Sequence, residues 1–382
     1  MPRTPAPVDI TAALAGAVLT VDLAAVAANY RLVRERLGRA EAAAVVKADA
    51  YGLGVAPVAG ALAAAGCRTF CVAHVAEGIY LRQVLDGLGG DHAKAAVHVL
   101  NGLLPGAEDA CAGHRLTPAL GSLGEIERWR ALARRLGRKL PAIVHVDTGM
   151  LRLGLPPDEL RRLADQPGLL DGMTVEVVMS HLACSDERDH PKNREQLDAF
   201  KTARRALPMG KAAFANSGGI FLGPDFHFDL ARPGVVLCGV APLAGEPNPM
   251  AQVVRLQGKI LQVRRVDTPQ TVGYGASHRV EGPGRIATVG VGYADGYLRS
   301  LSNRGTGYIG DAPVPVVGRV SMDLITLDVT QVPERQASVG ALVDLIGPLN
   351  PVDRVAQEAG TIGYEILTSL GARYHRAYVG GA

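Results

Sequence analysis

The amino-acid sequence predicts an α/β fold, a TIM-type (β/α)8 barrel followed by a mostly-β C-terminal domain. The 382 residues exceed what one small hydrophobic core usually organises, so two domains are expected. Hydrophobic residues make up 48% of the chain and charged residues 20%, a balance typical of packed globular proteins. Strand-like and helix-like runs alternate up to about residue 240, and strand-like runs then follow one another without long helices.

The first part of the chain carries the repeated strand-then-helix pattern. Apolar residues recur at helical spacing in six segments: 23–37, 56–65, 76–85, 125–136, 157–164 and 194–206. Eight short apolar runs are predicted as parallel strands: 43–47, 69–73, 97–100, 116–120, 143–146, 175–180, 212–215 and 235–239. Eight strands alternating with helices favour the barrel, and a doubly wound sheet is the alternative.

The second part of the chain is predicted to be a β domain. Strand-like runs separated by turn residues occur at 253–266, 285–291, 314–317, 321–329 and 341–346, and a short helix is expected at 353–359. The proline-rich stretch 242–249 is the expected linker. We therefore expect a barrel domain at residues 17–247, beginning with a strand at 17–21, and a β domain at residues 248–382.

Charge, hydropathy and cysteine content exclude several classes of partner and cofactor. The net charge is +3 and no basic run interleaves with aromatic residues, so neither nucleic acid nor a membrane surface is expected as a partner. The apolar stretch 11–21 is too short to span a bilayer. The five cysteines lack the spacing of a zinc site, so no metal is expected, and they indicate reduced thiols in a cytoplasmic protein.

Lys47 ends a buried apolar strand, and Gly52 and Gly54 interrupt the segment that follows. Burying a lysine ammonium at this place costs free energy unless the group is solvated, paired with an anion or covalently bound. It is either an ordinary lysine at a strand end or one that condenses with a carbonyl, as the lysines of pyridoxal-phosphate enzymes do.

Other reactive or polar residues recur after predicted strand ends, where a barrel carries its functional groups. They are Asp147, Arg152, His181, Asn216 and Ser217, with Arg232 and Gly234 around the start of the last predicted strand. Ser217 offers a hydroxyl, and the nearby glycines let backbone N–H groups approach an anion such as phosphate. Asn216 to Gly219 alone is equally compatible with an ordinary turn, and His181 alone is more often a structural histidine.

Taken in order, the motifs resemble those of the alanine racemase family, from Val18 to Tyr374. The matching stretches are Lys47 to Tyr51, Asp147 to Gly154, Arg232-Pro233-Gly234, Gly292 to Gly296 and Ser321-Met322-Asp323. The resemblance implies a pyridoxal-phosphate-dependent isomerase that interconverts L-alanine and D-alanine, either for D-alanine biosynthesis or for alanine breakdown. It also implies a homodimer whose active sites are shared between the subunits.

The resemblance implies a role for each matching residue. Lys47 would hold pyridoxal 5'-phosphate as an internal aldimine, and Tyr274 would be the second catalytic base, acting in the site of the other subunit. Arg232 would face the pyridine nitrogen and His181 would pack against the ring. Further cofactor-binding residues, most of them at the phosphate, would be Tyr51, Asn216, Ser217, Gly234, Val235 and Tyr364. Arg152 and Met322 would hold the substrate carboxylate, with Tyr293 and Met322 lining the entrance.

Two bases suit a racemisation, because a proton leaves one face of Cα and another proton arrives at the opposite face. Lys47 and Tyr274 would serve these two faces. Arg232 cannot readily give up a proton, so it would leave the pyridine nitrogen unprotonated. We expect this choice to favour return of the proton to Cα over transamination.

One position departs from the family pattern. Many relatives carry a lysine, often carbamylated, two residues before Asp-Thr-Gly to pair with the arginine, whereas this chain has His145. Since histidine cannot be carbamylated, an anion or a water is expected beside Arg152. The alternative functions are a broader-specificity amino-acid racemase, a decarboxylase on the related barrel, and a non-catalytic pyridoxal-phosphate-binding barrel protein. The last would lack a second domain with Tyr274.

Overall fold

The computed structural model describes residues 11–381, which divide into two compact units. Among these residues, one unit holds Ala24–Ala251, and the other combines residues 11–23 with Gln252–Gly381. Within residues 11–381, no helix has the length and apolar character that crossing a bilayer requires.

The first unit is a parallel barrel that closes through one interrupted strand. Glu41–Ala42 (β2) pairs with β10 and Ala44–Val45 (β3) pairs with β4, so this strand joins both ends of the sheet. Between them, Ala43 N donates to Ala231 O at 2.8 Å. The other strands are β4 Thr69–Val72, β5 Ala96–Val99, β6 Thr117–Leu120, β7 Leu140–His145, β8 Met173–Met179, β9 Lys211–Ala213 and β10 Leu230–Ala231. The predicted barrel is confirmed, and its closure excludes the doubly wound sheet.

The eighth barrel strand lies earlier in the chain than the sequence predicts. It is Leu230–Ala231, whereas residues 235–239, predicted as a strand, contain the 3-10 helix η4, Val235–Cys238. A short buried apolar run looks the same in a strand and in a helix, which explains the error. The correction places Arg232 and Gly234 directly after a strand rather than at the start of one, on the rim that carries barrel active sites.

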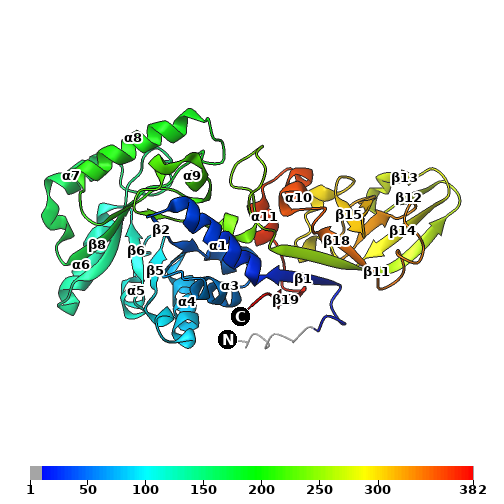
Figure 1. Ribbon diagram of the computed structural model, residues 1–382, viewed down its shortest axis with the longest axis horizontal. Helices are drawn as coiled ribbons and strands as arrows, with labels where there is room; N and C mark the ends of the chain where they lie inside the picture. The colour runs from blue at the N-terminus through cyan, green and yellow to red at the C-terminus, as the bar shows by residue number, and fades with distance from the viewer. Residues whose placement is uncertain (1–10, 382) are drawn as a thin grey trace. The chain divides into compact units, whose positions relative to one another are not determined.

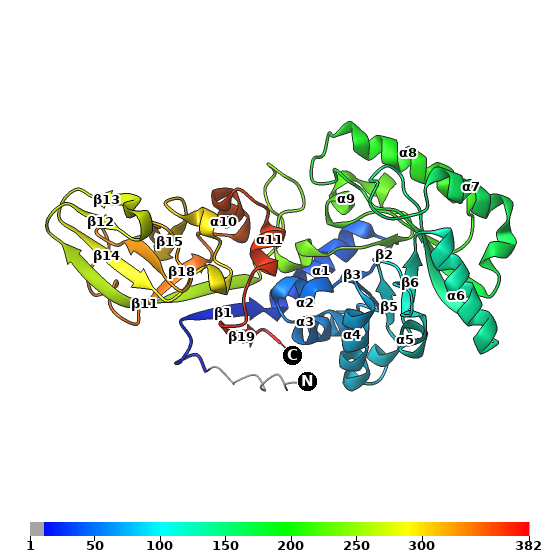
Figure 2. The ribbon, with the colours of Figure 1, turned by 180° about the vertical axis from the view of Figure 1, so that it is seen from behind.

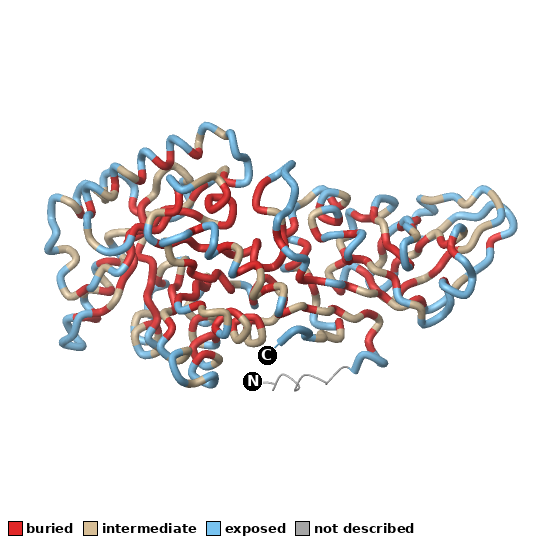
Figure 3. The backbone as a smooth tube through the Cα atoms, viewed as in Figure 1, coloured by how far each residue is buried: buried red, intermediate tan, exposed pale blue. Residues whose placement is uncertain are grey.

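Helices cover the outside of the barrel (Figure 1). The longer ones overlap the predicted helices and are α1 Leu23–Leu37, α3 Val55–Ala64, α4 Val75–Leu88, α6 Leu123–Leu136, α7 Pro157–Asp165 and α8 Pro191–Ala206. The short helices α2 Lys47–Gly52, α5 Glu108–Gly113 and α9 Ser217–Leu222 were not predicted, because six residues do not establish a helical period. Buried positions follow the strands and the inward helix faces, and the outer faces of α7 and α8 are exposed (Figure 3).

The second unit is built on the long strand β11, Val254–Val266. Its first part pairs with β1 (Ala17–Asp22) and β18 (Leu342–Ile346), and its second part pairs with β14 (Gly284–Val289), as Figure 2 shows. The remaining elements are β12 Gln270–Val272, β13 His278–Val280, β15 Thr306–Ile309, β16 Ala312–Pro315, β17 Ile325–Asp328, α10 Val352–Ala359, α11 Gly363–Thr368 and β19 His375–Val379. The predicted mostly-β domain is confirmed.

Strand β1 belongs to this β unit rather than to the barrel. The sequence places residues 17–21 at the start of the barrel domain, but β1 pairs antiparallel with β11 and parallel with β19. Its residues alternate between buried and half-buried, which predicts a strand but does not identify its partners. The partner comes from the far end of the chain, so the local pattern could not assign β1 to a domain.

An aromatic cluster anchors α8 to the barrel strands. Phe200 is fully buried, stacks on Phe214 with ring centroids 4.8 Å apart, and meets Phe228 edge-on at 5.0 Å. Such pairs combine burial of a large apolar area with favourable ring geometry. The cluster therefore fixes the helix that follows β8.

Phe200→Ala should lower the free energy of unfolding of the barrel unit by about 3–5 kcal/mol, because its packed neighbours cannot refill the cavity. The measurement is urea unfolding followed by the fluorescence of Trp129, the single tryptophan of the chain, which is buried in this unit. Tyr80→Ala, at a side chain that is 51% exposed, is the control and should cost less than about 1 kcal/mol. Equal losses in both variants would contradict the anchoring role of Phe200.

Candidate active site

The carboxyl ends of the barrel strands carry most of the predicted site residues. In the barrel unit these residues follow strands around one rim: Lys47 and Tyr51 after β3, Arg152 after β7, His181 after β8, Asn216 and Ser217 after β9, and Arg232, Gly234 and Val235 after β10. The other predicted residues belong to the β unit: Tyr274, Tyr293, Met322 and Tyr364. The sequence-predicted residues thus form two groups, one in each unit.

Lys47 opens a turn with a left-handed backbone. Residues 48–51 have φ values between 52° and 58°, a conformation that costs roughly 1–2 kcal/mol for each residue with a side chain. The carboxylate of Glu77, on α4, stabilises the turn by accepting hydrogen bonds from Ala48 N (2.8 Å) and Ala73 N (2.7 Å). Asp49 adds a bond from Val55 N (2.7 Å). The segment after β3 is therefore fixed to the loop after β4.

The environment of Lys47 favours its neutral amine. Burial lowers the pKa of Lys47, the Arg152 guanidinium lowers it further, and the Glu77 carboxylate acts in the opposite direction. Only the neutral amine attacks a carbonyl or accepts a proton. These surroundings therefore make the neutral amine of Lys47 more readily available for covalent and acid–base chemistry than that of an exposed lysine.

Arg232 is a buried cation with an unpartnered donor. Its Nη2 donates to Ser180 O at 2.5 Å, whereas its Nη1 is buried and has no hydrogen-bond partner within the described residues. Burial lowers the pKa of Arg232 to about 10, which leaves the side chain charged at neutral pH. Because a buried N–H without an acceptor is unfavourable, Nη1 is suited to donate to a bound molecule.

Tyr51, Ser217 and Gly234 form a small cradle. Gly234 N donates to Ser217 Oγ at 2.9 Å, and a Cβ at Gly234 would lie only 2.1 Å from the Tyr51 hydroxyl. Next to the cradle, Asn216 caps α9 by accepting a hydrogen bond from Gly219 N (3.0 Å), and Val235 begins η4. Hydroxyls, close-approaching backbone and helix-start N–H groups are the donors that bind phosphate in proteins.

This donor set fits pyridoxal phosphate. The Lys47 amine is available for its aldehyde, the cradle of Tyr51, Ser217 and Gly234 for its phosphate, and the unpartnered Nη1 of Arg232 for its pyridine nitrogen. All of these residues lie in segments that follow barrel strands, on the same rim of the barrel.

The loop that carries Arg152 is folded around Asp147. Asp147 Oδ1 accepts hydrogen bonds from the backbone N–H groups of Gly149, Met150 and Leu151, at 2.9, 3.0 and 3.2 Å. These bonds fix the backbone directly before Arg152. The guanidinium therefore projects from a preformed loop.

Gln196 ties the Arg152 loop to the His181 segment. This α8 side chain is fully buried, and its Oε1 accepts a hydrogen bond from Ala183 N (2.8 Å). Its Nε2 donates to His181 O (2.9 Å) and to Thr148 Oγ1 (3.3 Å). The loops after β7 and β8 thus share one anchor.

Two histidines among these cations are neutral. Burial lowers the pKa of His145 to about 4 and that of His181 well below its usual value, and the charges of Arg232 and Arg152 act in the same direction. A neutral His181 can pack against an aromatic ring. The space bounded by His145, Arg152 and their neighbours has a volume of about 10 Å³, enough for a single water molecule.

In the β unit, backbone hydrogen bonds bring Tyr293 and Met322 together. Tyr293 N donates to Ser321 O, and Ala294 N donates to Met322 O, each at 3.0 Å. Met322 lies in a turn closed by Ser321 N and Leu324 O (3.0 Å), because β17 begins only at Ile325 and not at 321 as predicted. The two predicted entrance residues are therefore neighbours.

Arg373 clamps the loops of Tyr293 and Met322. Its guanidinium binds both carboxylate oxygens of the buried Asp295, at 2.6 and 2.8 Å, and one oxygen of Asp323 at 2.7 Å. A bidentate arginine–carboxylate pair combines strength with a defined orientation. The two loops are thereby held in one arrangement.

Tyr274 and Tyr364 are solvent-accessible in the β unit. Tyr274 is 72% exposed and lies beside Arg319 and Ser321 in a cavity of about 440 Å³. Tyr364, on α11, is 39% exposed. The Tyr274 hydroxyl is thus accessible to a molecule outside its own unit.

Three positioning residues were not predicted from the sequence: Glu77, Gln196 and Arg373. Glu77 carries a detectable signal, since it occupies the third position of α4 and completes a capping box. Gln196 and Arg373 carry no such signal, because their partners lie in segments distant along the chain.

Comparison with known proteins gives one consistent result. The sequence models described as "Alanine racemase, N-terminal domain" and "Alanine racemase, C-terminal domain" match residues 21–242 and 253–378. The chain is 54% identical to an alanine racemase of Rhodospirillum rubrum, over 96% of both chains. It is 48% identical to a catabolic alanine racemase of Mesorhizobium japonicum, over 97% of this chain and 96% of the other.

Solved structures are similar over the same span. The crystal structure of alanine racemase from Bartonella henselae, with covalently bound pyridoxal phosphate, matches with a TM-score of 0.90 and 42% identity. This match covers 96% of the present chain and 100% of the other. The biosynthetic alanine racemase of Pseudomonas aeruginosa matches with a TM-score of 0.87 and 35% identity, over 95% and 99%.

Acid should destabilise the barrel unit partly through His145. Folding lowers the pKa of His145 from 6.5 to about 4, so between these pH values the unfolded chain binds a proton that the folded chain does not bind. The contribution of His145 to the free energy of unfolding is therefore complete above pH 6.5 and is lost as the pH falls toward 4. It amounts to about 3 kcal/mol. Urea unfolding of His145→Gln, followed by Trp129 fluorescence at pH 7.5 and 4.5, should show a correspondingly smaller acid effect than the unsubstituted chain. His114→Gln is the matched control, and identical pH dependence with and without His145 would refute this assignment.

Proposed function

Because this chain belongs to the alanine racemase family, we propose that Lys47 and Tyr274 are the two opposed bases of its reaction. The protein is a pyridoxal-phosphate-dependent isomerase that interconverts L-alanine and D-alanine. The proposal concerns how the residues of this chain divide that work.

The observation that carries the assignment is the buried Arg232, whose Nη1 is unpartnered, on the same rim as Lys47. When bound, pyridoxal phosphate supplies an electron sink that acidifies Cα of the amino acid. Arg232 has only donors, so it would leave the pyridine nitrogen as an acceptor and would limit that sink. This limit favours return of the proton to Cα over loss of the amino group.

Lys47 and Tyr274 would move the protons. Burial and Arg152 favour the neutral Lys47 amine, which accepts the Cα proton on one face and returns it in the reverse direction. Tyr274 would serve the opposite face with its hydroxyl. Arg152 would hold the substrate carboxylate through a charge-assisted hydrogen bond, from a loop fixed by Asp147.

The remaining predicted residues would bind the cofactor and frame the entrance. His181 would pack against the cofactor ring as a neutral imidazole. The phosphate would be held by the cradle together with Asn216, Val235 and Tyr364. Met322 would contribute its backbone to the carboxylate, and Tyr293 and Met322 would line the entrance, held by Arg373.

We further propose a homodimer in which each barrel unit receives Tyr274 from the β unit of the partner. Three exposed apolar side chains support it, because they lie at functional residues: Tyr274 is 72% exposed, Met322 53%, and Leu151, beside Arg152, 89%. Large apolar side chains that are exposed in each unit beside proposed functional residues are what an interface between subunits would cover. We place the enzyme in the cytoplasm, which suits its five free cysteines.

Tyr274→Phe should slow exchange of the Cα proton far more for one enantiomer of alanine than for the other. Loss of a general base lowers the rate of proton transfer by about 10²- to 10⁴-fold on the face of Cα that it serves. Lys47 would still transfer protons on the other face. The measurement is deuterium wash-in from heavy water, run separately on L-alanine and D-alanine. Equal losses for the two enantiomers would show that Tyr274 is not the base of one face.

Mixing two inactive variants tests the shared site. A dimer of one Lys47→Ala subunit and one Tyr274→Phe subunit contains one site with both bases, provided that Tyr274 acts in the partner's site. Random exchange of subunits should then restore about a quarter of the wild-type activity, since half of the dimers are mixed and each has one complete site. If both bases come from one subunit, the mixture stays inactive. Size-exclusion chromatography with light scattering checks that dimers are present.

A further inference from the structure

A second cavity lies at the opposite end of the strand that leads to Lys47. It has a volume of about 620 Å³, within the range of small-molecule sites. Its lining comes from α1, from the start of β2 and from the loop before β4, and its charged side chains are Arg31, Arg34, Glu35, Arg39, Glu41 and Arg68. Glu41 begins the strand and Lys47 follows its end, so this cavity is separate from the cofactor site.

The carboxylate that begins the strand does not balance the arginines. Glu41 is already bound by Lys211 Nζ at 2.6 Å and by the Thr69 hydroxyl. Its negative charge is therefore compensated from within the barrel. Glu35 is the other carboxylate of the lining, against four guanidinium groups.

The cavity brings together several arginines that carboxylates do not engage. Some arginines elsewhere are engaged in this way, as Arg115 is by Asp86 at 2.6 Å. Among residues 11–381, by contrast, no ion pair or hydrogen bond of the Arg31, Arg34 or Arg39 side chains is present. Three guanidinium groups are thus available to an anion.

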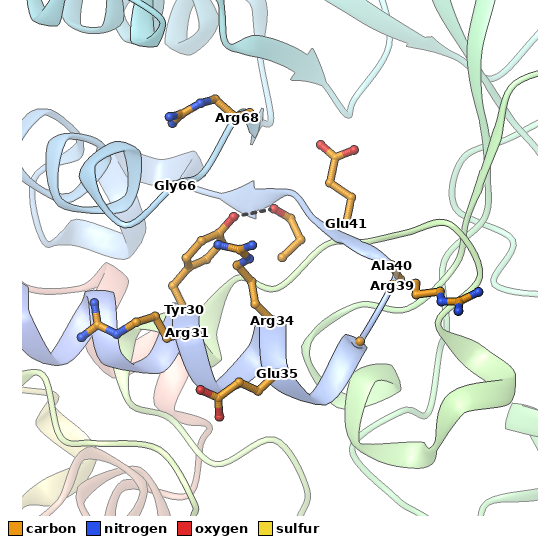
Figure 4. Close-up of a pocket in the computed structure, with 11 residues that line it drawn as sticks. Tyr30, Arg31, Arg34, Glu35, Arg39, Ala40, Glu41, Gly66 and Arg68 are labelled. Atoms are coloured by element: carbon orange, nitrogen blue, oxygen red, sulfur yellow. Dashed lines mark hydrogen bonds between the residues drawn. The ribbon is translucent and has the colours of Figure 1, made fainter.

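Figure 4 shows how the side chains are placed. Arg34 extends from α1 past the ring of Tyr30, Arg68 lies on the other side of the cavity, and Arg31 and Arg39 extend toward opposite ends. Tyr30 is buried, and its hydroxyl donates to the backbone of β2 at 3.1 Å, so it forms a fixed wall. The arginines are therefore spread along the cavity rather than directed at a single point.

Helix capping explains part of this arrangement. Both α1 and α3 end beside the cavity, and arginine compensates the partial negative charge of a helix C-terminus. Arg68 Nη1 does so by donating to Ala63 O (3.1 Å) and Cys67 O (3.0 Å). Arg31 lies two turns before the end of α1 and is not explained in this way.

We propose that this cavity binds a small anion containing a chain of two or three phosphate groups. Guanidinium groups match phosphate oxygens through paired, charge-assisted hydrogen bonds, and several arginines spread along a cavity favour several linked anionic groups over one. Inorganic oligophosphate and the phosphate chain of a nucleotide share this chemistry.

The test is calorimetric titration of the pyridoxal-phosphate-loaded enzyme with inorganic tripolyphosphate. Arg34→Gln and Arg68→Gln should each raise the Kd at least about tenfold, because each removes a charge-assisted hydrogen bond. Arg134→Gln, at an exposed arginine of α6, is the matched control and should leave the Kd unchanged. The cofactor absorbance should stay constant during the titration, which separates this cavity from the phosphate cradle.

The outcomes are distinct. ATP binding as tightly as tripolyphosphate supports recognition of the phosphate chain alone, and tighter binding of ATP identifies a nucleotide as the source. Absence of binding to the wild type, or the same Kd in the wild type and both variants, overturns the proposal. Lower thermal stability of Arg34→Gln and Arg68→Gln with an unchanged Kd would assign the arginines to helix capping and overturns it too.

Discussion

Backbone N–H groups at the barrel rim need acceptors, and carboxylate or amide side chains from the surrounding helices supply them. Glu77 bridges the segments after β3 and β4, and Glu125 bridges those after β5 and β6 by accepting hydrogen bonds from Leu103 N and Gly121 N, both at 2.8 Å. Gln196 accepts a hydrogen bond from Ala183 N after β8, and it joins that segment to the one after β7 by donating to His181 O and to Thr148 Oγ1. Each acceptor satisfies groups that would otherwise be costly to bury. The positions of Lys47, Arg152 and His181 depend on these bridges.

The left-handed turn after Lys47 illustrates this dependence. Four consecutive residues with side chains occupy a conformation that is unfavourable for each of them, so the turn persists only because the surroundings hold it. Glu77 and Asp49 provide that support through charged hydrogen bonds to backbone N–H groups. In the proposed enzyme, this turn would connect Lys47, which would hold the aldehyde of the cofactor, with Tyr51, which would bind its phosphate.

The charge of the rim explains the class of ligand. Arg152 and Arg232 are cations, and burial together with these arginines lowers the pKa values of Lys47, His145 and His181. A site with these charges is stabilised by bound anions. The phosphate of the cofactor and the carboxylate of the amino acid are two such anionic groups. The β unit contributes in a different way, since Arg373 fixes the loops of Tyr293 and Met322 while Tyr274 stays accessible.

The sequence by itself determined the barrel and the β domain, and its motifs predicted the site residues, because helical and strand periodicity and short motifs are local properties. It misplaced the eighth strand, since the apolar run at 235–239 has no period long enough to separate a strand from a 3-10 helix. It also assigned β1 to the wrong unit, because its partner β19 lies at the far end of the chain. Only the tertiary structure decided that Glu77, Gln196 and Arg373 position the site and that Arg232 keeps one buried donor unpartnered. These properties are contacts between distant segments, and such contacts exist only once the chain has folded.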